Sequence, residues 1–249
     1  MNSRRDHCAL LSYTVCFLLA PRFSQFFMEA DYGGAEHASS DSFISLGDQV
    51  YLHEDGTSGH ASVEGFTDMQ LCLDHESNLT AESVFGAHAV FRLMPQQMYT
   101  MARQLRSFDA HPPDINQEQL KLRRTQMLEE ARREKALNQS EVENTVGREV
   151  RYGKVLQLQH VVSGKLISVS HLASIHNRDA RRVQICESDV GEAAWFRIVP
   201  KLRVHTDGEK VRAGEPVIIE NVTSGLKLHI GIMFGSAERG SEINASGDE

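Results

Sequence analysis

Apolar and polar residues alternate on both sides of a Ser-Gly turn in residues 153–169, and the same pattern returns in residues 214–230. Alternation with a period of two is typical of β-strands, and glycine supplies the positive φ angle that a tight turn needs. Each stretch therefore predicts a β-hairpin. The matching positions, 61 residues apart, are Gly153, Val155, Leu156, Leu158, Gly164, Ile167 and Val169 in the first copy and Gly214, Pro216, Val217, Ile219, Gly225, Leu228 and Ile230 in the second.

A third and weaker copy of the pattern lies upstream. Its matching residues are Gly47, Val50 and Leu52, with Ser58-Gly59 at the turn. The ends of the units also repeat, since residues 90–95 (VFRLMP) are similar to residues 195–200 (WFRIVP). Three units of about four short strands each predict a closed, threefold all-β barrel, because closure leaves no exposed sheet edge. We expect a mainly β protein, a β-trefoil over residues 42–244.

The pattern changes between the first two units. Residues 96–108 place apolar side chains at helical spacing, and His111-Pro112-Pro113 ends that helix. Asp114, with Gln117 three residues later, resembles a capping box, and helix-favouring sequence continues to about Asn138. We therefore expect a helix-turn-helix arm inserted into the trefoil at residues 96–146. Its first helix carries Met98, Met101 or Ala102, Leu105 and Phe108 on one face.

The second helix of the expected arm is rich in charge. Basic and acidic side chains interleave along it, which favours a solvated face with salt bridges over a surface for an anionic partner. The basic residues that make the arm a candidate contact surface are Lys121, Arg124, Arg132 and Arg133. The whole chain has a net charge of −8, so nucleic acid is not expected as a partner.

The first residues have two interpretations. Arg4-Arg5 followed by an apolar run over residues 8–20 is typical of a secretory signal, and the run is too short to span a bilayer as a helix. The competing interpretation starts translation at Met28 and treats the residues before it as a mispredicted extension. On either interpretation we expect residues 1–41 to form a leader outside the fold, ending in a disordered polar stretch.

The last unit lacks one of the repeated features. Units one and two end in an aromatic strand, whereas unit three reaches only a candidate strand near residues 242–244. We therefore expect residues 245–249 to be a truncated tail, and the chain to be a fragment of a longer subunit.

Catalytic and metal-binding motifs are missing from the sequence. It contains no GxSxG, HExxH or P-loop pattern, and no Cys or carboxylate completes a metal spacing beside His171 and His176. We expect neither an enzyme nor a bound cofactor or metal.

Four stretches, in this order, carry a resemblance to a known family. They are FRLMPQQMYTMARQL, VGREVRYGKVLQLQHVVSGKLISV, GEAAWFRIVPK and GEPVIIENVTSGLKLHI. With the charged arm between the first two, they resemble the N-terminal suppressor domain of inositol 1,4,5-trisphosphate receptors, calcium-release channels related to ryanodine receptors. Units two and three also resemble the MIR repeat of protein O-mannosyltransferases.

The resemblance implies a cytosolic domain on the endoplasmic-reticulum face of a homotetrameric channel. Such a domain contacts the channel's ligand-binding core and neighbouring subunits, lowers ligand affinity and relays ligand binding to the pore. The family's basic residues for the trisphosphate lie in downstream domains, so this chain is not expected to bind that ligand. A start at Met28 agrees with a cytosolic domain better than a signal peptide does.

One turn is a candidate interaction loop, formed by Ser163, Gly164, Lys165 and Leu166. In the family, the position of Leu166 is held in vertebrate members by an exposed aromatic residue that suppression requires. Strand alternation places Leu166 on the face opposite Ile167 and Val169, so we expect it to be exposed; the alternative is a core residue.

A different class of function stays open. The chain is alternatively a secreted or luminal MIR-type module that binds sugars or unfolded chains and uses a real signal peptide. Its glycosylation sequons begin at Asn78, Asn138, Asn221 and Asn244. The long arm argues against this alternative, because luminal relatives join their repeats by short links.

Overall fold

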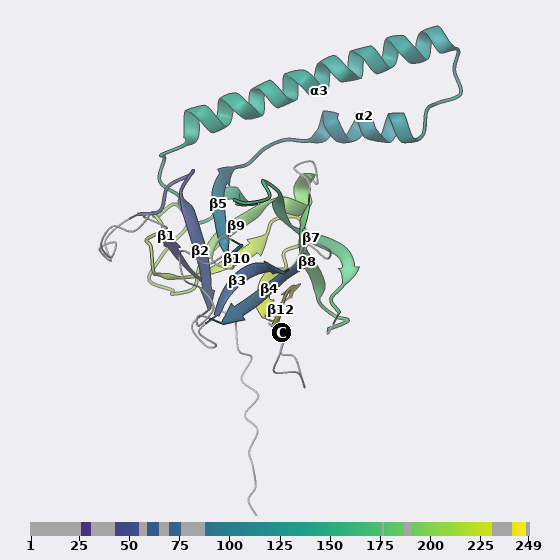
Figure 1. Ribbon diagram of the computed structural model, residues 1–249. Coiled ribbons are helices and arrows are strands. Elements are labelled where there is room, and N and C mark those ends of the chain that lie inside the picture. Colours follow the sequence, from purple (N-terminus) through teal and green to yellow (C-terminus); the bar gives the residue numbers. More distant parts are fainter. Residues whose placement is uncertain are drawn as a thin grey trace, which may run out of the picture.

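The computed structural model of the protein describes residues 26–30, 43–54, 59–64, 70–75, 88–175, 177–186, 191–230 and 241–247. These residues form antiparallel strands and two α-helices (Figure 1). The strands are β1 (Phe26–Ala30), β2 (Gln49–Glu54), β3 (Gly59–Glu64), β4 (Gln70–His75), β5 (Val90–Pro95), β6 (Val155–His160), β7 (Leu166–Ala173), β8 (Arg181–Cys186), β9 (Phe196–Pro200), β10 (Pro216–Asn221), β11 (Lys227–Ile230) and β12 (Ser241–Ser246). The helices are α2 (Thr100–Ala110), α3 (Gln117–Thr145) and the short 3₁₀ helix η2 (Gly191–Ala194).

The strands build a barrel closed by a cap of hairpins. β2, β5, β6, β9, β10 and β1 pair in turn, and β1 then pairs with β2 to close the ring. The cap consists of the hairpins β3–β4, β7–β8 and β11–β12. The second strands of these hairpins, β4, β8 and β12, pair with one another. This is the β-trefoil that the threefold repeat predicts, so the predicted fold class is confirmed.

Apolar residues of equivalent strands meet in one core. Phe91 and Phe196, which hold matching positions in the closing strands β5 and β9, are both 0% exposed. Leu156 and Leu158 of β6, and Val217 and Ile219 of β10, point into the same core, because alternate residues of a strand share a face. Burying such a side chain stabilises the fold by about 1.5–3 kcal/mol relative to leaving it in water.

The predicted turns repeat in atomic detail. In the β6–β7 turn the Gly164 N–H donates to the carbonyl of His160, and in the β10–β11 turn the Gly225 N–H donates to that of Asn221, both at 2.9 Å. Gly164 and Gly225 have φ angles of 68° and 69°, which favour glycine. The two hairpins are thus one structural unit used twice.

The arm differs from its predicted limits at both ends of α3. The N-cap is Asn116, not Asp114, because the Asn116 Oδ1 accepts a hydrogen bond from the Gln119 N–H at 2.8 Å. The helix continues past Asn138 to Thr145. Hydrogen bonds between side chains four residues apart, such as the one from Gln139 Nε2 to Glu143 Oε1 at 2.9 Å, support this last polar part.

Residues 26–30 differ from the expectation of a leader outside the fold. They form β1 inside the barrel, and Met28 is 0% exposed. The candidate strand near residues 242–244 is present as β12, which also takes in residues 245 and 246 of the expected tail. The remaining residues of the expected leader, 1–25 and 31–41, lie outside the described residues. Among the described helices, none is both long and apolar enough to cross a membrane.

Candidate functional site at the root of the arm

The arm joins the barrel through two short segments, and we call the residues around them the arm root. The first segment, with Gln97 and Tyr99, leads from β5 into α2; the second, with Thr145 and Gly147, leads from α3 towards β6. In Figure 1 the two helices lie side by side and extend away from the barrel. A rigid root is needed for an arm of this length to hold one direction.

Polar contacts fix the first segment of the arm root. The Gln97 N–H donates to Oε1 of the buried Gln157 on β6 at 3.2 Å. The Tyr99 hydroxyl donates to Gln97 Oε1 at 2.7 Å and lies 3.3 Å from Gln157 Oε1. One buried strand residue therefore positions both the backbone and the aromatic ring of the segment that starts α2.

The second segment is held by backbone bonds to unit one. The Gly147 N–H donates to the Leu46 carbonyl at 2.8 Å, and the Leu46 N–H donates to the Arg148 carbonyl at 2.9 Å. Gly47 has a φ of 96°, and a Cβ at Gly47 would lie 3.0 Å from Val146 Cγ1. This glycine is therefore required both for its backbone conformation and for the close approach of the arm.

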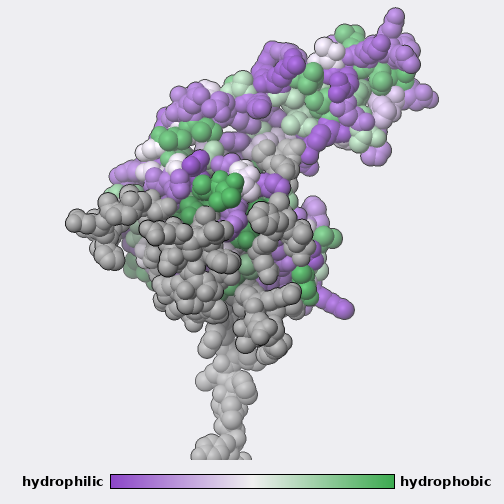
Figure 2. All heavy atoms as spheres, viewed as in Figure 1, coloured by the Kyte–Doolittle hydropathy of each residue, from purple (hydrophilic) through white to green (hydrophobic). Residues whose placement is uncertain are grey.

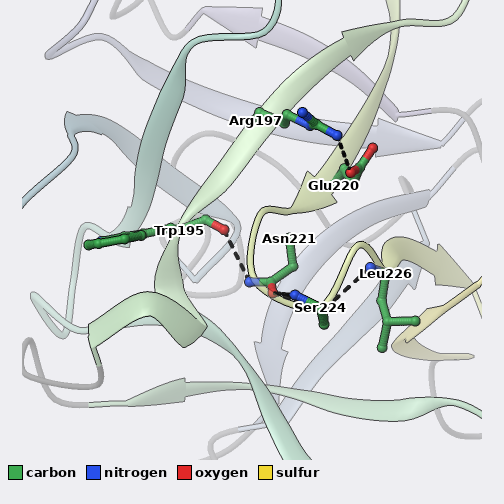
Figure 3. A network of polar contacts seen from close by, with 6 residues as sticks. All are labelled: Trp195, Arg197, Glu220, Asn221, Ser224 and Leu226. Carbon is green, nitrogen blue, oxygen red and sulfur yellow. Dashed lines mark hydrogen bonds and ion pairs between the residues drawn. The ribbon is translucent and has the colours of Figure 1, made fainter.

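Trp195 connects the arm root to unit three. Its Nε1 donates to the Gln97 carbonyl at 3.0 Å. Its own carbonyl accepts from Asn221 Nδ2 at 3.1 Å, and Asn221 Oδ1 accepts from the Ser224 hydroxyl at 2.8 Å (Figure 3). Next to this network, Arg197 and Glu220 form an ion pair at 2.6 Å. The β10–β11 turn and the start of the arm are therefore tied to the same residue.

The expectation that Leu166 faces solvent is wrong. Leu166 is 3% exposed and packs in a small cluster with Tyr99 and Ala194. Strand alternation does place it opposite Ile167, which belongs to the main core. The outer face of β7 is nevertheless covered here, because the arm root and η2 pack over it.

The rest of the predicted interaction loop lies at the surface. Ser163 and Gly164 are exposed and Lys165 is half-buried, at the tip of the β6–β7 hairpin. The Ser163 hydroxyl bonds to the His160 ring at Nδ1 over 2.8 Å, and it accepts from the Lys165 N–H at 3.3 Å. Val162, at 56% exposure, is the apolar residue that this turn presents to solvent.

The buried ring of His160 holds the β6–β7 turn through its bond to Ser163. It is 1% exposed and stacks on His88, with 5.8 Å between the ring centroids. Burial, reinforced by the charge of the neighbouring His88, lowers the pKa of His160 to about 4. The ring is therefore neutral at physiological pH and keeps its Nδ1 paired with Ser163.

The two helices of the arm are joined by side chains of α3. Glu134 accepts hydrogen bonds from the Met101 N–H at 3.0 Å and the Ala102 N–H at 3.3 Å, which places a carboxylate at the N-terminus of α2. Asn138 bonds to both the N–H and the carbonyl of Met98, at 2.9 and 2.6 Å. These contacts make α2 and α3 a single rigid hairpin.

The predicted basic residues of the arm all lie on α3 and all are exposed. Arg124 forms a two-pronged pair with Asp109 of α2 at 2.7 and 3.1 Å, and this pairing lowers the pKa of the Asp109 carboxyl. Arg132 lies 3.6 Å from Glu129. Lys121 and Arg133 have no ion pair within the described chain. Figure 2 shows hydrophilic side chains over much of the arm, with hydrophobic ones interspersed.

A cavity of about 360 Å³ opens beside the arm root. Its lining includes Arg103 of α2, Arg181 of β8 and Glu192 of η2. Arg103 packs so closely over η2 that a Cβ at Gly191 would lie 2.7 Å from Arg103 Nη1. Within the described residues, no group of three His, Cys, Asp or Glu side chains is placed to hold a metal ion.

Several residues of the arm root were not found from the sequence. Tyr99 and Trp195 lie in the stretches that carry the family resemblance, but Tyr99 holds no repeated position, and the counterpart of Trp195 in unit one is Val90, which has no polar group in its side chain. Gln157 is a polar residue inside an apolar strand, and this is a pattern that points to a buried hydrogen bond.

Two of the sequon asparagines are buried. Asn221 is 1% exposed and Asn244 is 0% exposed. The Asn221 side chain already makes hydrogen bonds through both Nδ2 and Oδ1. Neither asparagine is open to glycosylation in the folded domain, so these two sequons give the luminal alternative no support. Asn78 lies outside the described residues.

A family model and a curated relative point to the same family. A family model described as inositol 1,4,5-trisphosphate/ryanodine receptor matches residues 39–248. Inositol 1,4,5-trisphosphate receptor itr-1 of Caenorhabditis elegans is 33% identical over 96 residues, which are 38% of this chain and 3% of that relative. A solved Caenorhabditis elegans protein of unknown function has a TM-score of 0.53 at 10% identity, covering 84% of this chain and 92% of the other, and shows a likeness of fold alone.

Proposed function

This chain belongs to the inositol 1,4,5-trisphosphate/ryanodine receptor family, and on that premise we propose that it is the N-terminal regulatory domain of an inositol 1,4,5-trisphosphate-gated calcium-release channel. In this role it lowers the ligand affinity of the channel's binding core and couples ligand binding to gating. Its place is the cytosolic face of the endoplasmic-reticulum membrane, within a homotetramer.

The observation that carries this proposal is the reach of the family match. It runs over residues 39–248 and so includes the arm together with strands β2 to β12 of the trefoil. A trefoil alone serves many functions, and fold by itself does not assign one. The inserted arm and its junctions are the features that favour a channel domain over a simple binding module.

The arm root supplies a physical route for the coupling. Lowering a ligand's affinity through another domain requires a coupling free energy of about 1–3 kcal/mol, or roughly 5- to 150-fold. Such a bias is transmitted by elements that move as one body. Tyr99 and Leu166 belong to one buried cluster with Ala194, which joins the start of the arm to the base of the β6–β7 hairpin, so a displacement of either segment is passed to the other.

We assign the two exposed surfaces to different partners. The hairpin tip, with Val162, Ser163 and Lys165, contacts the binding core of the same subunit. The arm contacts a neighbouring subunit, where Lys121 and Arg133 are available because they form no ion pair within the described chain.

The chain itself is proposed not to bind the trisphosphate. Three phosphates need several convergent cations, whereas the cavity at the arm root sets Glu192 beside Arg103 and Arg181. Calorimetry on this chain alone is expected to detect no specific binding. Salt-resistant binding at micromolar concentration would contradict this assignment.

The regulatory role is tested by joining this chain to the ligand-binding core of a family member. Trisphosphate affinity is measured for the core alone and for the joined protein. A core that binds more tightly alone supports the proposal, and equal affinities oppose it. A matched joined protein without residues 100–145 separates the arm from the trefoil, and its affinity is expected to stay near that of the intact joined protein.

A further inference from the structure

Strand β1 holds a place that the threefold repeat assigns to a closing strand. In unit one the closing strand β5 pairs with β2, and in unit two the closing strand β9 pairs with β6. β1 pairs with β10 of unit three in the same way. Each closing strand also pairs with the opening strand of the next unit, β5 with β6 and β9 with β10. β1 does the same with β2 of unit one. A segment from the other end of the sequence therefore completes unit three.

The equivalence extends to a single hydrogen bond. The opening glycines Gly47 and Gly153 donate from their N–H groups to the carbonyls of Leu93 and Ile198, at 2.7 and 2.9 Å. The third opening glycine, Gly214, donates to the carbonyl of Met28 at 3.0 Å. Leu93, Ile198 and Met28 are each 0% exposed. Met28 is thus the third copy of one core position.

β1 fills the space between β2 and β10, and we call this space the groove. Met28 lies opposite Leu52 of β2, which is also 0% exposed, and Phe27 lies opposite Pro216 of β10. A strand between β2 and β10 is bonded through its main chain on both sides. Main-chain bonds provide affinity in such strand addition, while the pocket for an inward side chain provides selectivity.

No tight turn connects β1 to either neighbour. Ala30 precedes the first residue of β2, Gln49, by 19 positions, and β10 begins only at Pro216. Replacing β1 by another strand would therefore leave each hairpin of the cap covalently intact.

We propose that the groove between β2 and β10 is a strand-binding site and that residues 26–30 are its intramolecular ligand. The site takes an extended peptide antiparallel to both neighbours, with an apolar side chain at the position of Met28. When the cis segment is weakened, the groove accepts a peptide of the same chemistry in trans.

The test uses the full chain and a labelled peptide of residues 24–32. Three chains are compared: the unaltered one, Met28→Asp and the conservative control Met28→Leu. A second peptide carries Met28→Asp itself. Fluorescence anisotropy is expected to show the native peptide binding the Met28→Asp chain at least about 10-fold more tightly than the substituted peptide does, because a buried carboxylate without a partner is costly. Neither peptide is expected to bind the Met28→Leu chain.

Two results would overturn the proposal. One is a folded Met28→Asp chain that binds neither peptide, or both equally. The other comes from hydrogen exchange on the unaltered chain, which decides even if Met28→Asp does not fold. The amides of residues 26–30 and of Gly214 are expected to exchange at least about 100-fold more slowly than unstructured amides. Exchange at the unstructured rate would show that the groove does not hold this segment.

Discussion

The indole Nε1 of Trp195 donates a hydrogen bond to the main-chain carbonyl of Gln97 at 3.0 Å, across 98 residues of sequence. This bond joins the residue that precedes the closing strand β9 to the first residues of the arm. Because Gln97 is also bonded to Gln157 of β6, two separate parts of the barrel set the direction of the arm.

Replacing Trp195 by Phe tests whether this bond orients the arm. The change keeps an aromatic ring and removes the only donor on the indole, so we expect a loss of about 0.5–1.5 kcal/mol in the free energy of unfolding. Hydrogen exchange is expected to accelerate in residues 97–101 while the barrel strands keep their protection. An equal acceleration throughout the domain would show that Trp195 has no specific role in the arm root.

Leu166→Ala is expected to destabilise the domain. The side chain is 3% exposed and packs on Tyr99 and Ala194, so truncation leaves a cavity and costs about 2–4 kcal/mol. Denaturant unfolding measures the change. The matched control is Lys165→Ala at the next position, which is expected to stay within about 0.5 kcal/mol of the unaltered domain. Equal free energies of unfolding for the two variants would contradict the burial of Leu166 and support the exposed position expected from the sequence.

Glu134→Gln tests the contact between the two helices of the arm. The amide keeps one acceptor oxygen but loses the charge that faces the N-terminus of α2, so about 0.3–1 kcal/mol should be lost. Circular dichroism is expected to show lower helicity on heating than in the control Glu130→Gln, which alters an exposed residue of the same helix. Identical melting of the helices in both variants would contradict the role of Glu134.

The lowered pKa of His160 should make the folded domain less stable in mild acid. Its pKa is about 4 in the folded domain and about 6.5 when unfolded. The unfolded chain therefore binds more protons between these values, so stability is complete above about pH 6.5 and falls as the pH drops towards 4. The expected loss is about 1–3 kcal/mol.

The control for this pH dependence comes from the repeat itself. Asn221 holds the position equivalent to His160 and binds the equivalent serine, so His160→Asn places a residue of proven fit in the turn. Unfolding measured from pH 7 to pH 4 should show a shallower slope in His160→Asn. Equal slopes would assign the acid sensitivity to other groups.

The features that repeat were the features that could be predicted from the sequence. Gly164 and Gly225, and Phe91 and Phe196, recur because each unit needs the same turn and the same inward ring. These local requirements identify the trefoil and the inserted arm. The end of α3 at Thr145 was placed too early because its last turns are polar and depend on side-chain bonds within the helix.

The contacts that do not repeat could not be predicted. Leu166 is buried in a cluster with Tyr99, which lies 67 positions earlier in the chain. Period-two alternation carries no information about what covers the outer face of a strand. Met28 belongs to a segment that does not repeat the hairpin pattern of the three units. Its place in the barrel is set by pairing with β10 and β2, which the sequence pattern does not indicate.

One equilibrium measurement tests the proposed regulatory role most directly: the affinity of labelled inositol 1,4,5-trisphosphate for a family binding core in three forms. These forms are the core alone, the core joined to this chain, and the joined protein with Val162→Asp and Lys165→Ala at the hairpin tip. We expect the joined protein to bind about 5- to 150-fold more weakly than the core alone. The altered tip should return most of that affinity without lowering the melting temperature. A core that binds equally tightly in all three forms would contradict a regulatory role for this domain.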